Sequence, residues 1–308
     1  MRQTAVPRPP AGPVPVVLCV RPGIAPVLER AGLGCAVVPF RPGTAPPPGH
    51  RADVVLGGNV AGEEVLPWAE GAGWVHLTGV GVDGVPPGLS AGRVVTYSPG
   101  ANAVAAVLAF AKRLPEAWEP APGPLRPDVL TGRTLGLAGY GTIARAVAER
   151  ARAFGMAVLV HTRTPRPDTT GIRFVDRAEL AARSDHLVLA ASATPQTRHL
   201  VDAAFLARTR PGVHLVNVAR GALVDQEALR GYLDSGHVAR ATLDVTDPEP
   251  LPAGHWLRHH PRARVSPHVA AGNPDSLREA VAVFAANYRR YLAGEELANV
   301  VEPSCPLR

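Results

Sequence analysis

Short runs of β-branched and other apolar residues alternate with longer Ala- and Leu-rich segments along most of this chain. The short, continuous apolar runs predict strands that are buried on both faces, and the segments between them predict crossover helices. Because strand–helix–strand alternation makes neighbouring strands parallel, helices are expected on both faces of the sheet. The chain is therefore expected to have an α/β, doubly wound architecture.

The alternation falls into two series, which predicts two α/β units. The first series has expected strands at 16–20, 35–39, 53–56, 74–78 and 94–97, with helices at 25–31 and 63–70. An Ala-rich helix at 101–114 and a proline-rich connection at 117–128 follow. The second series has expected strands at 134–138, 158–161, 186–190, 213–218, 239–244 and 264–266, and helices at 142–154, 176–182, 203–208 and 225–235. A final helix is expected at about 274–292.

Composition and targeting signals favour a folded cytoplasmic protein. Hydrophobic residues make up 46% and charged residues 19% of the 308 positions. No apolar run approaches the roughly 20 residues needed to span a bilayer. The proline-rich start lacks the apolar core of a signal peptide, so a disordered tail and a cytoplasmic location are expected. Three cysteines, Cys19, Cys35 and Cys305, show neither metal-ligand nor disulfide spacing, so no metal site is expected.

The net charge of +6 comes from arginines scattered along the chain, with Lys112 as the only lysine among 32 basic residues. A Walker-type phosphate loop or a Schiff-base lysine would have to use Lys112, which lies in neither context. One stretch, 258–264, is densely basic. It is interpreted as a solvated loop, with a weak attraction for anionic substrates as the alternative, and nucleic acid is not an expected partner.

A glycine-rich turn joins the expected strand 134–138 to the helix that follows. Its order G-x-G-x-x-A places Gly139, Gly141 and Ala144 where a dinucleotide-binding turn has its small residues. Gly139 would permit the tight turn, Gly141 would let the backbone approach a pyrophosphate, and Ala144 would let the helix pack on the strand. The helix start, with Thr142 and Ile143, would present N–H groups to the pyrophosphate.

The next strand indicates which dinucleotide is bound. An NAD enzyme usually has an acidic residue at its end, for the adenosine ribose. This chain has Thr162, Arg163 and Thr164 there. A hydroxyl and a guanidinium would bind a 2′-phosphate that a carboxylate would repel. NADP is therefore the expected cofactor, and NAD stays possible.

Three residues with chemically useful side chains follow strands of the second series. Arg220 follows 213–218, Glu249 follows 239–244, and His268 follows 264–266. The carboxyl ends of neighbouring strands in an open α/β sheet converge on one crevice. A guanidinium can bind a carboxylate, and an imidazole beside a carboxylate can act as a general acid or base.

An ordered string of motifs from about Leu77 to Val301 resembles the D-isomer-specific 2-hydroxyacid dehydrogenases, the family of glyoxylate/hydroxypyruvate reductases and D-lactate dehydrogenases. Its markers are Gly79-Val80-Gly81-Val82-Asp83, Asn102-Ala103, the glycine turn, Thr194-Pro195-Gln196-Thr197, Asn217-Val218-Ala219-Arg220-Gly221, Leu243-Asp244-Val245, Glu249-Pro250 and Ser266-Pro267-His268. The chain departs from the family at Ala106, often an acid there, at Ser192, often a proline, and at Thr162.

The resemblance implies a fold and an assembly. A Rossmann-type cofactor domain, residues 99–274, would be inserted into a flavodoxin-like substrate domain formed by residues 1–98 and 275–308. The family usually forms homodimers around the helix at 101–114, so a homodimer is expected.

The resemblance also implies roles for individual residues. His268 would be the general acid in reduction, and Glu249 would pair with its imidazole, favour the protonated ring and fix its orientation. Arg220 would bind the substrate carboxylate and polarise the carbonyl. Asp244 would accept from the nicotinamide amide or shape its site, and backbone N–H groups of Val80 and Gly81 would clasp the carboxylate.

Other functions stay open at this point. A dinucleotide-sensing corepressor could keep the same three residues without turnover. Formate dehydrogenases of this family carry glutamine where this chain has Glu249, and phosphite dehydrogenases need a lysine that the first domain lacks. A larger 2-oxo acid from a specialised biosynthetic pathway is the alternative substrate. Specificity is expected to depend on the first domain, around Gly57-Gly58-Asn59.

Overall fold

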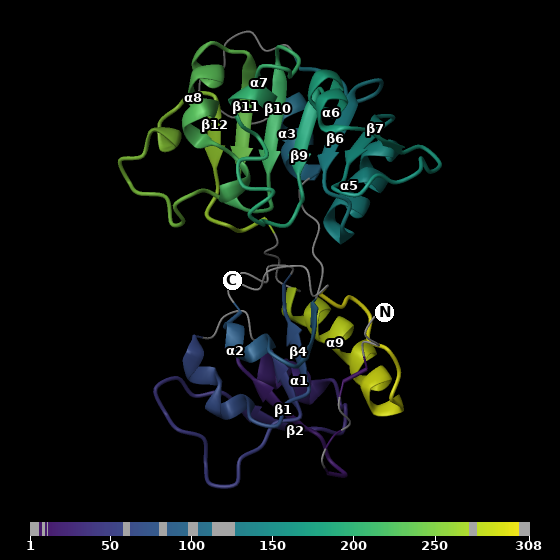
Figure 1. Cartoon of the computed structure of the whole chain (residues 1–308), viewed down its shortest axis with the longest axis vertical. Coiled ribbons are helices and arrows are strands. Elements are labelled where there is room, and N and C mark those ends of the chain that lie inside the picture. The colour runs from purple at the N-terminus through teal and green to yellow at the C-terminus, as the bar shows by residue number, and fades with distance from the viewer. Residues whose placement is uncertain are drawn as a thin grey trace. The chain divides into compact units, whose positions relative to one another are not determined.

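The computed structural model describes residues 6–7, 10, 12–57, 62–79, 85–97, 104–112, 127–270 and 276–301 (Figure 1). Most of the expected proline-rich tail and of the connection at 117–128 lies outside these residues. The chain divides into two compact units, residues 1–100 with 272–308, and residues 101–271. Within the described part of the chain, no helix combines the length and apolar character needed to cross a membrane.

Unit 1 is built on a parallel sheet of five strands. They are β1 (Val16–Cys19), β2 (Ala36–Pro39), β3 (Val54–Leu56), β4 (Trp74–Leu77) and β5 (Val94–Tyr97). Their spatial order is β2-β1-β3-β4-β5, and every pairing between them is parallel. This is the flavodoxin-like order, whose direction reverses between β1 and β3. The expected flavodoxin-like sheet is confirmed.

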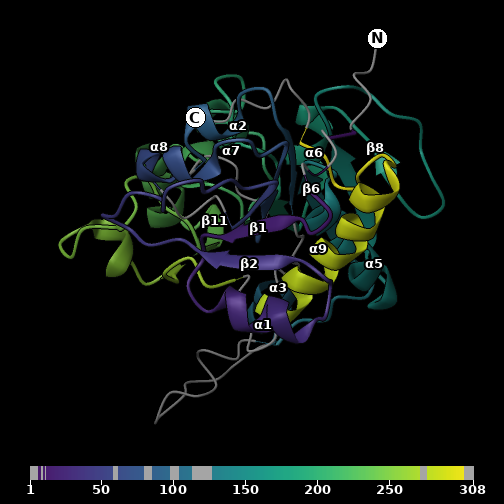
Figure 2. The same ribbon diagram turned by 90° about the horizontal axis from the view of Figure 1, so that it is seen from below.

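Helices cover both faces of this sheet. On one face, α1 (Ile24–Arg30) and α9 (Ser276–Ala293) lie side by side (Figure 2). Both helices pack against β1, β3 and β4. On the other face lie the 3₁₀ turns η2 (Glu63–Val65) and η3 (Pro67–Ala69) and the short helix α2 (Pro87–Ser90). The prediction of a single helix at 63–70 is wrong. Pro67 has no N–H to donate, and the segment forms two 3₁₀ turns that meet there.

Unit 2 is built on a parallel sheet of seven strands. They are β6 (Thr134–Ala138), β7 (Ala157–His161), β8 (Arg173–Phe174), β9 (His186–Leu189), β10 (Val213–Asn217), β11 (Val238–Leu243) and β12 (Ala263–Val265). Their order, β12-β11-β10-β9-β6-β7-β8, is that of a Rossmann sheet extended by one strand. All pairings are parallel. The expected Rossmann-type sheet is confirmed, while the two-residue β8 was too short to predict.

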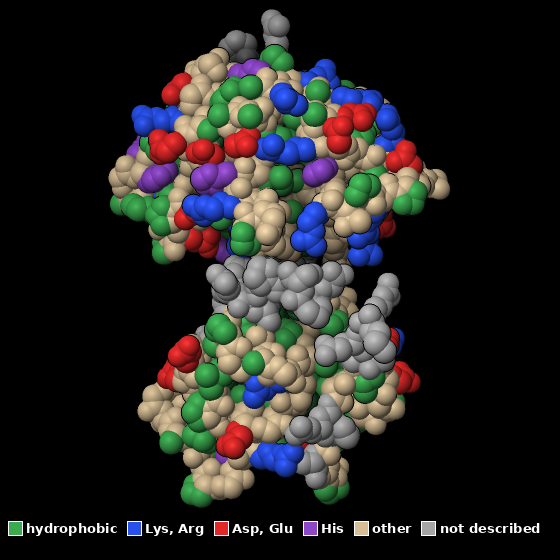
Figure 3. All heavy atoms as spheres, in the orientation of Figure 1, with side chains coloured by type: hydrophobic (Ala, Val, Ile, Leu, Met, Phe, Trp, Pro, Cys, Tyr) green, Lys and Arg blue, Asp and Glu red, His purple; other side chains and the backbone are tan. Residues whose placement is uncertain are grey.

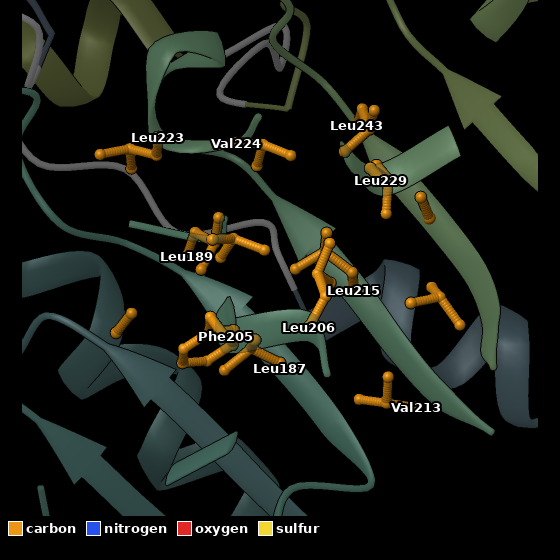
Figure 4. Close-up of a cluster of buried hydrophobic side chains, with 14 of the residues drawn as sticks. Leu187, Leu189, Phe205, Leu206, Val213, Leu215, Leu223, Val224, Leu229 and Leu243 are labelled. Carbon is orange, nitrogen blue, oxygen red and sulfur yellow. The ribbon is translucent and has the colours of Figure 1, made fainter. Parts of the chain in front are cut away.

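Alternating side chains in unit 2 form two cores. Leu187, Leu189 and Leu215 point to a core that is closed by α6 (Arg177–Arg183), α7 (Ala203–Leu206) and α8 (Gln226–Asp234), and Figure 4 shows its centre. Val188 and Val216, the intervening residues, point to the opposite core under α3 (Val104–Ala111) and α5 (Thr142–Ala153). Because successive strand residues face opposite sides, both cores come from the same strands.

Two buried histidines lie together in unit 2. The Nδ1 atoms of His186 and His214 are 3.3 Å apart, and His214 Nε2 is 2.9 Å from the Thr242 hydroxyl. The Phe110 ring stacks on His214, with ring centroids 4.3 Å apart. Burial lowers the pKa of His186 to about 4, and burial together with His186 holds the pKa of His214 well below its usual value. Both rings are therefore neutral at physiological pH.

We expect this pair to make the free energy of unfolding depend on pH. The unfolded chain binds protons on both rings below about pH 6.5. In the folded chain His186 resists protonation until about pH 4, and the pKa of His214 also lies well below its usual value. Stability should therefore fall as the pH drops through this window, by up to about 1.4 kcal/mol per pH unit for each ring. Urea unfolding at pH values between 7.5 and 4.5, spaced by about half a pH unit, measures the free energy of unfolding. His186→Asn should make the free energy of unfolding depend less on pH than His259→Asn, which replaces an exposed histidine and serves as the control. An unchanged pH dependence in His186→Asn would contradict the assignment of a low pKa to His186.

Candidate active site

The glycine turn adopts a backbone that only glycine accommodates. Gly139, directly after β6, has φ +98° and donates its N–H to the His161 carbonyl at 2.8 Å. A Cβ at Gly139 would lie 2.6 Å from the Ala190 carbonyl oxygen. Ala144, fully buried in the first turn of α5, packs into the core beneath the sheet. The structure thus gives Gly139 and Ala144 the positions that the sequence motif predicts.

The start of α5 is open to an anionic ligand. Gly141 is the N-cap residue in extended conformation, and a Cβ there would meet no described atom within 4 Å. Among the described residues, no side chain caps the helix, and its first turn, which begins at Thr142 and Ile143, holds no acidic residue. Backbone N–H groups at a helix start, together with the helix dipole, favour an anion. The turn therefore fits a dinucleotide pyrophosphate.

The predicted 2′-phosphate residues follow β7. Thr162 is half-buried and its hydroxyl donates to the Thr164 carbonyl at 2.8 Å, which closes a tight turn. Arg163, inside this turn, and Thr164 are exposed. β7 lies beside β6 in parallel register, so both strands end at the same edge of the sheet. The geometry places a guanidinium at the edge that also carries the glycine turn.

His268 and Glu249 are brought together by the loops that follow β12 and β11. The Nδ1 atom of His268 lies 2.6 Å from Glu249 Oε1. Both side chains are partly exposed, 45% for His268 and 39% for Glu249, so the ring can reach a ligand while it stays paired. Because Nδ1 is used by the carboxylate, Nε2 is the nitrogen that can exchange a proton with a substrate.

Asp244 holds the loop that carries His268. Its buried carboxylate accepts from the Ser266 hydroxyl at 2.6 Å and from the backbone N–H groups of Val269 and Ala270 at 2.9 and 2.8 Å. The His268 N–H donates to the Asp244 carbonyl at 2.9 Å, and His268 itself has φ +54°. Asp244 therefore stabilises a loop with a left-handed residue at its centre. A contact between Asp244 and a nicotinamide amide stays a prediction.

Arg220 lies in a turn that is fixed from two sides. The fully buried Asn217, at the end of β10, donates from Nδ2 to the Arg220 carbonyl at 2.8 Å and accepts from the Ala219 N–H at 3.0 Å. On the other side, a Cβ on Gly221 would lie 2.0 Å from the Thr246 carbonyl oxygen. The Arg220 turn therefore touches the segment that leads to Glu249.

Sequence reasoning did not assign a role to Asn217, Gly221 or Ser266, although all three belong to the motifs around the predicted site. A polar side chain at the buried end of an apolar strand was the available signal for Asn217. The predicted substrate-binding residues Val80 and Gly81 lie outside the described residues, as do Gly58 and Asn59.

The basic stretch 258–264 has its guanidinium groups bound to backbone carbonyls. Arg258 donates to the Leu251 and Pro252 carbonyls, and Arg264 donates to the Pro261 and Ala263 carbonyls. On the face drawn in Figure 3, arginine and acidic side chains are interspersed and do not form one large basic patch. These contacts support a structural role for the stretch.

Comparison with known proteins finds similarity to dehydrogenases. The model of the D-isomer specific 2-hydroxyacid dehydrogenase NAD binding domain matches residues 105–270. The human glyoxylate reductase/hydroxypyruvate reductase is 36% identical over 209 residues, which are 63% of this chain and 63% of the human protein. D-3-phosphoglycerate dehydrogenase of Mycobacterium tuberculosis is 33% identical over 258 residues, 77% of this chain and 48% of that protein. The alignments thus span about half to two thirds of these relatives.

A solved structure extends the similarity to both units. The D-isomer specific 2-hydroxyacid dehydrogenase from Xanthobacter autotrophicus Py2, solved in complex with NADPH and MES, is 28% identical with a TM-score of 0.80. The match covers 93% of this chain and 98% of that chain.

Proposed function

We propose that this chain, which belongs to the D-isomer-specific 2-hydroxyacid dehydrogenase family, is an NAD(P)-dependent oxidoreductase that reduces a small 2-oxo acid to the 2-hydroxy acid. The 2.6 Å contact between His268 and Glu249 is the observation that carries the proposal. It gives an acid/base pair at the carboxyl edge of the same sheet whose glycine turn fits a dinucleotide. Glyoxylate and hydroxypyruvate are the first candidates, and a larger 2-oxo acid is the alternative.

The chain's own residues supply the parts of this reaction that the cofactor does not. When bound, a reduced nicotinamide supplies the hydride. Gly141, Thr142 and Ile143 would hold the pyrophosphate, and Arg220 would bind the substrate carboxylate. His268 would donate a proton from Nε2 to the carbonyl oxygen as negative charge develops there, and Glu249 would stabilise the protonated ring and hold its orientation.

The wider organisation of the enzyme is part of this proposal. Residues 99–274 would form the cofactor domain, and residues 1–98 with 275–308 the substrate domain, in which Val80 and Gly81 would clasp the carboxylate. The homodimer and the cytoplasmic location stay predictions.

A panel of 2-oxo acids assayed with NADPH and with NADH, by nicotinamide absorbance, tests the proposal. Glyoxylate and hydroxypyruvate are expected to be reduced. The dinucleotide-sensor alternative expects no turnover with any 2-oxo acid together with tight dinucleotide binding. That result would mean that the chain is a dinucleotide-binding protein and does not reduce 2-oxo acids.

The exposed Arg163 leads to a prediction about the cofactor. NADPH should be preferred over NADH in kcat/KM, because a guanidinium attracts the 2′-phosphate. Arg163→Ala should reduce this preference by about 10- to 100-fold, the size of a hydrogen bond to a charged group. Thr162→Asp should shift the preference toward NADH, because a carboxylate repels the phosphate.

Arg173→Ala, which removes an exposed guanidinium from β8, is the control and should leave the preference in place. A wild type that prefers NADH, with a ratio that Arg163→Ala does not change, would show that the phosphate site is wrongly assigned.

A further inference from the structure

The segment that carries Glu249, residues 246–250, is held by polar contacts. Thr246 is buried, whereas the rest of the segment is exposed. Thr246 donates its N–H to Glu249 Oε2 at 3.4 Å and its hydroxyl to the Pro248 carbonyl at 2.9 Å. Because the carboxylate is bonded to its own segment, a shift of the backbone there also shifts the carboxylate. An exposed segment with few buried apolar contacts moves easily unless other residues anchor it.

Gln226, the first residue of α8, anchors this segment through both ends of its side-chain amide. Its Oε1 accepts from the Asp247 N–H at 3.3 Å, and its Nε2 donates to the Asp247 carbonyl. A glutamine amide carries both an acceptor and a donor, so it can satisfy both backbone groups of one residue. The Gln226 side chain is half-buried, which partly protects these bonds from water. The two bonds fix the backbone two residues before Glu249.

The start of α8, which carries Gln226, is itself held in the core of unit 2. The N-cap residue Asp225 accepts from the Ala228 N–H at 3.0 Å, and its own N–H donates to the Val201 carbonyl at 3.0 Å. Leu229, within the first turn of the helix, is fully buried. A side chain carried by a helix can position a site more precisely than one carried by a loop. Gln226 therefore connects a well-held helix to an exposed segment.

Other contacts of this segment do not fix the backbone before Glu249. After Glu249 the chain is anchored by the buried Leu251, whose carbonyl also accepts from Arg258. Before Glu249, Arg198 pairs with the Asp247 carboxylate at 3.4 Å, but both side chains are exposed, and ion pairs of this kind contribute little. The bonds of the glutamine amide therefore set the position of the backbone before Glu249.

We propose that Gln226 is a positioning residue for the acid/base pair, because its hold on Asp247 keeps the Glu249 carboxylate within hydrogen-bond distance of His268 Nδ1. The proposal rests on the proposed function, in which this pair transfers the proton. The Nδ1–Oε1 distance is 2.6 Å, and a misplacement of about 1 Å can cost about 100-fold in rate. Gln226 acts through Glu249, so its removal should impair proton transfer and spare dinucleotide binding.

Gln226→Met tests this role, because methionine keeps the length of the side chain and removes both hydrogen bonds. On the best substrate of the 2-oxo acid panel, kcat should fall by about 10- to 100-fold, with the KM for NADPH nearly unchanged. Gln226→Ala should behave alike, and alanine favours the helix, so this second variant is expected to fold. Glu227→Ala is the control. It removes a contact of the same helix turn to Trp256 Nε1, at 3.3 Å, and should keep the wild-type kcat.

A double-mutant cycle with Glu249→Ala separates positioning from general support of the fold. Without the carboxylate there is nothing for Gln226 to position, so Gln226→Met should lower the kcat of Glu249→Ala by less than about twofold. If Gln226→Met causes its full loss in that background as well, Gln226 does not act through Glu249, and the proposal is overturned.

The state of the His268 ring gives a measurement that needs no turnover. Long-range proton–nitrogen NMR correlations show which ring nitrogen carries the proton, and Glu249 should hold it on Nδ1 in the neutral ring. Gln226→Met should shift the ring signals toward those of Glu249→Ala, whereas Glu227→Ala should leave them as in wild type. If wild type reduces no 2-oxo acid but Gln226→Met shows this shift, the enzyme assignment fails and the positioning role stands. If Gln226→Met leaves the ring signals as in wild type, the positioning role is wrong, and an active wild type would still support the enzyme assignment.

Discussion

Replacing His268 with alanine is expected to lower kcat for reduction by about 10²–10⁴-fold, the usual contribution of a positioned general acid. The side chain is 45% exposed and its Nδ1 is engaged by Glu249 at 2.6 Å, which leaves Nε2 as the nitrogen that would donate the proton. Without the ring, water would have to protonate the developing alkoxide. Steady-state kinetics on the best substrate of the panel measures the loss.

Two further measurements show that the loss comes from proton transfer. Fluorescence titration should give nearly normal NADPH binding to His268→Ala, because the glycine turn is formed by other strands of the sheet. His259→Ala, which removes an exposed histidine before β12, should retain activity. If His268→Ala keeps the wild-type kcat, another group donates the proton, and the family relationship would establish only the fold.

Glu249→Gln refines the same test. Glutamine keeps an acceptor near His268 but replaces a charge-assisted hydrogen bond with a weaker neutral one. The kcat for reduction should therefore fall, but by less than in His268→Ala. An unchanged kcat would mean that Glu249 only orients the ring.

The strands were predictable because their signal is local. Most expected boundaries lie within two residues of the observed ones, since a buried parallel strand is a continuous apolar run. The glycine turn was predictable for a similar reason. Gly139 has φ +98° and must be glycine, so the sequence pattern records a backbone requirement.

The interactions that hold the site are not local, and the sequence did not predict them. Asp244 contacts the loop at 266–270, more than twenty residues later, and Gln226 contacts the Asp247 backbone, 21 residues later. Such pairs depend on strand order and on loop paths that no short pattern encodes. At 63–70 the local pattern was itself misleading. It predicted one helix, but Pro67 interrupts the segment, which forms two 3₁₀ turns.

Gly221 leads to the second large expected effect. Gly221→Ala should lower the free energy of unfolding by about 3 kcal/mol, the upper range for overpacking, because the new Cβ would overlap backbone atoms that cannot rotate away. The Cβ would lie 2.0 Å from both the carbonyl carbon and the carbonyl oxygen of Thr246. Thr246 donates its N–H to Glu249 Oε2 at 3.4 Å. The displacement would therefore reach Arg220 on one side and Glu249 on the other.

The activity of Gly221→Ala should also fall. Under conditions where this variant is fully folded, its kcat/KM should be about 100-fold below that of wild type. A loss of that size corresponds to about 2.7 kcal/mol of transition-state stabilisation. Gly231→Ala is the matched control, because Gly231 is exposed within α8 and its Cβ would meet no described atom within 4 Å. That substitution should raise stability by about 0.5–1 kcal/mol and leave kcat/KM unchanged.

Urea unfolding and steady-state kinetics on both variants test these expectations. If Gly221→Ala is as stable and active as wild type, the close approach to Thr246 does not position Arg220 and Glu249. If it unfolds more readily but retains full kcat/KM, the contact stabilises the fold without contributing to the chemistry.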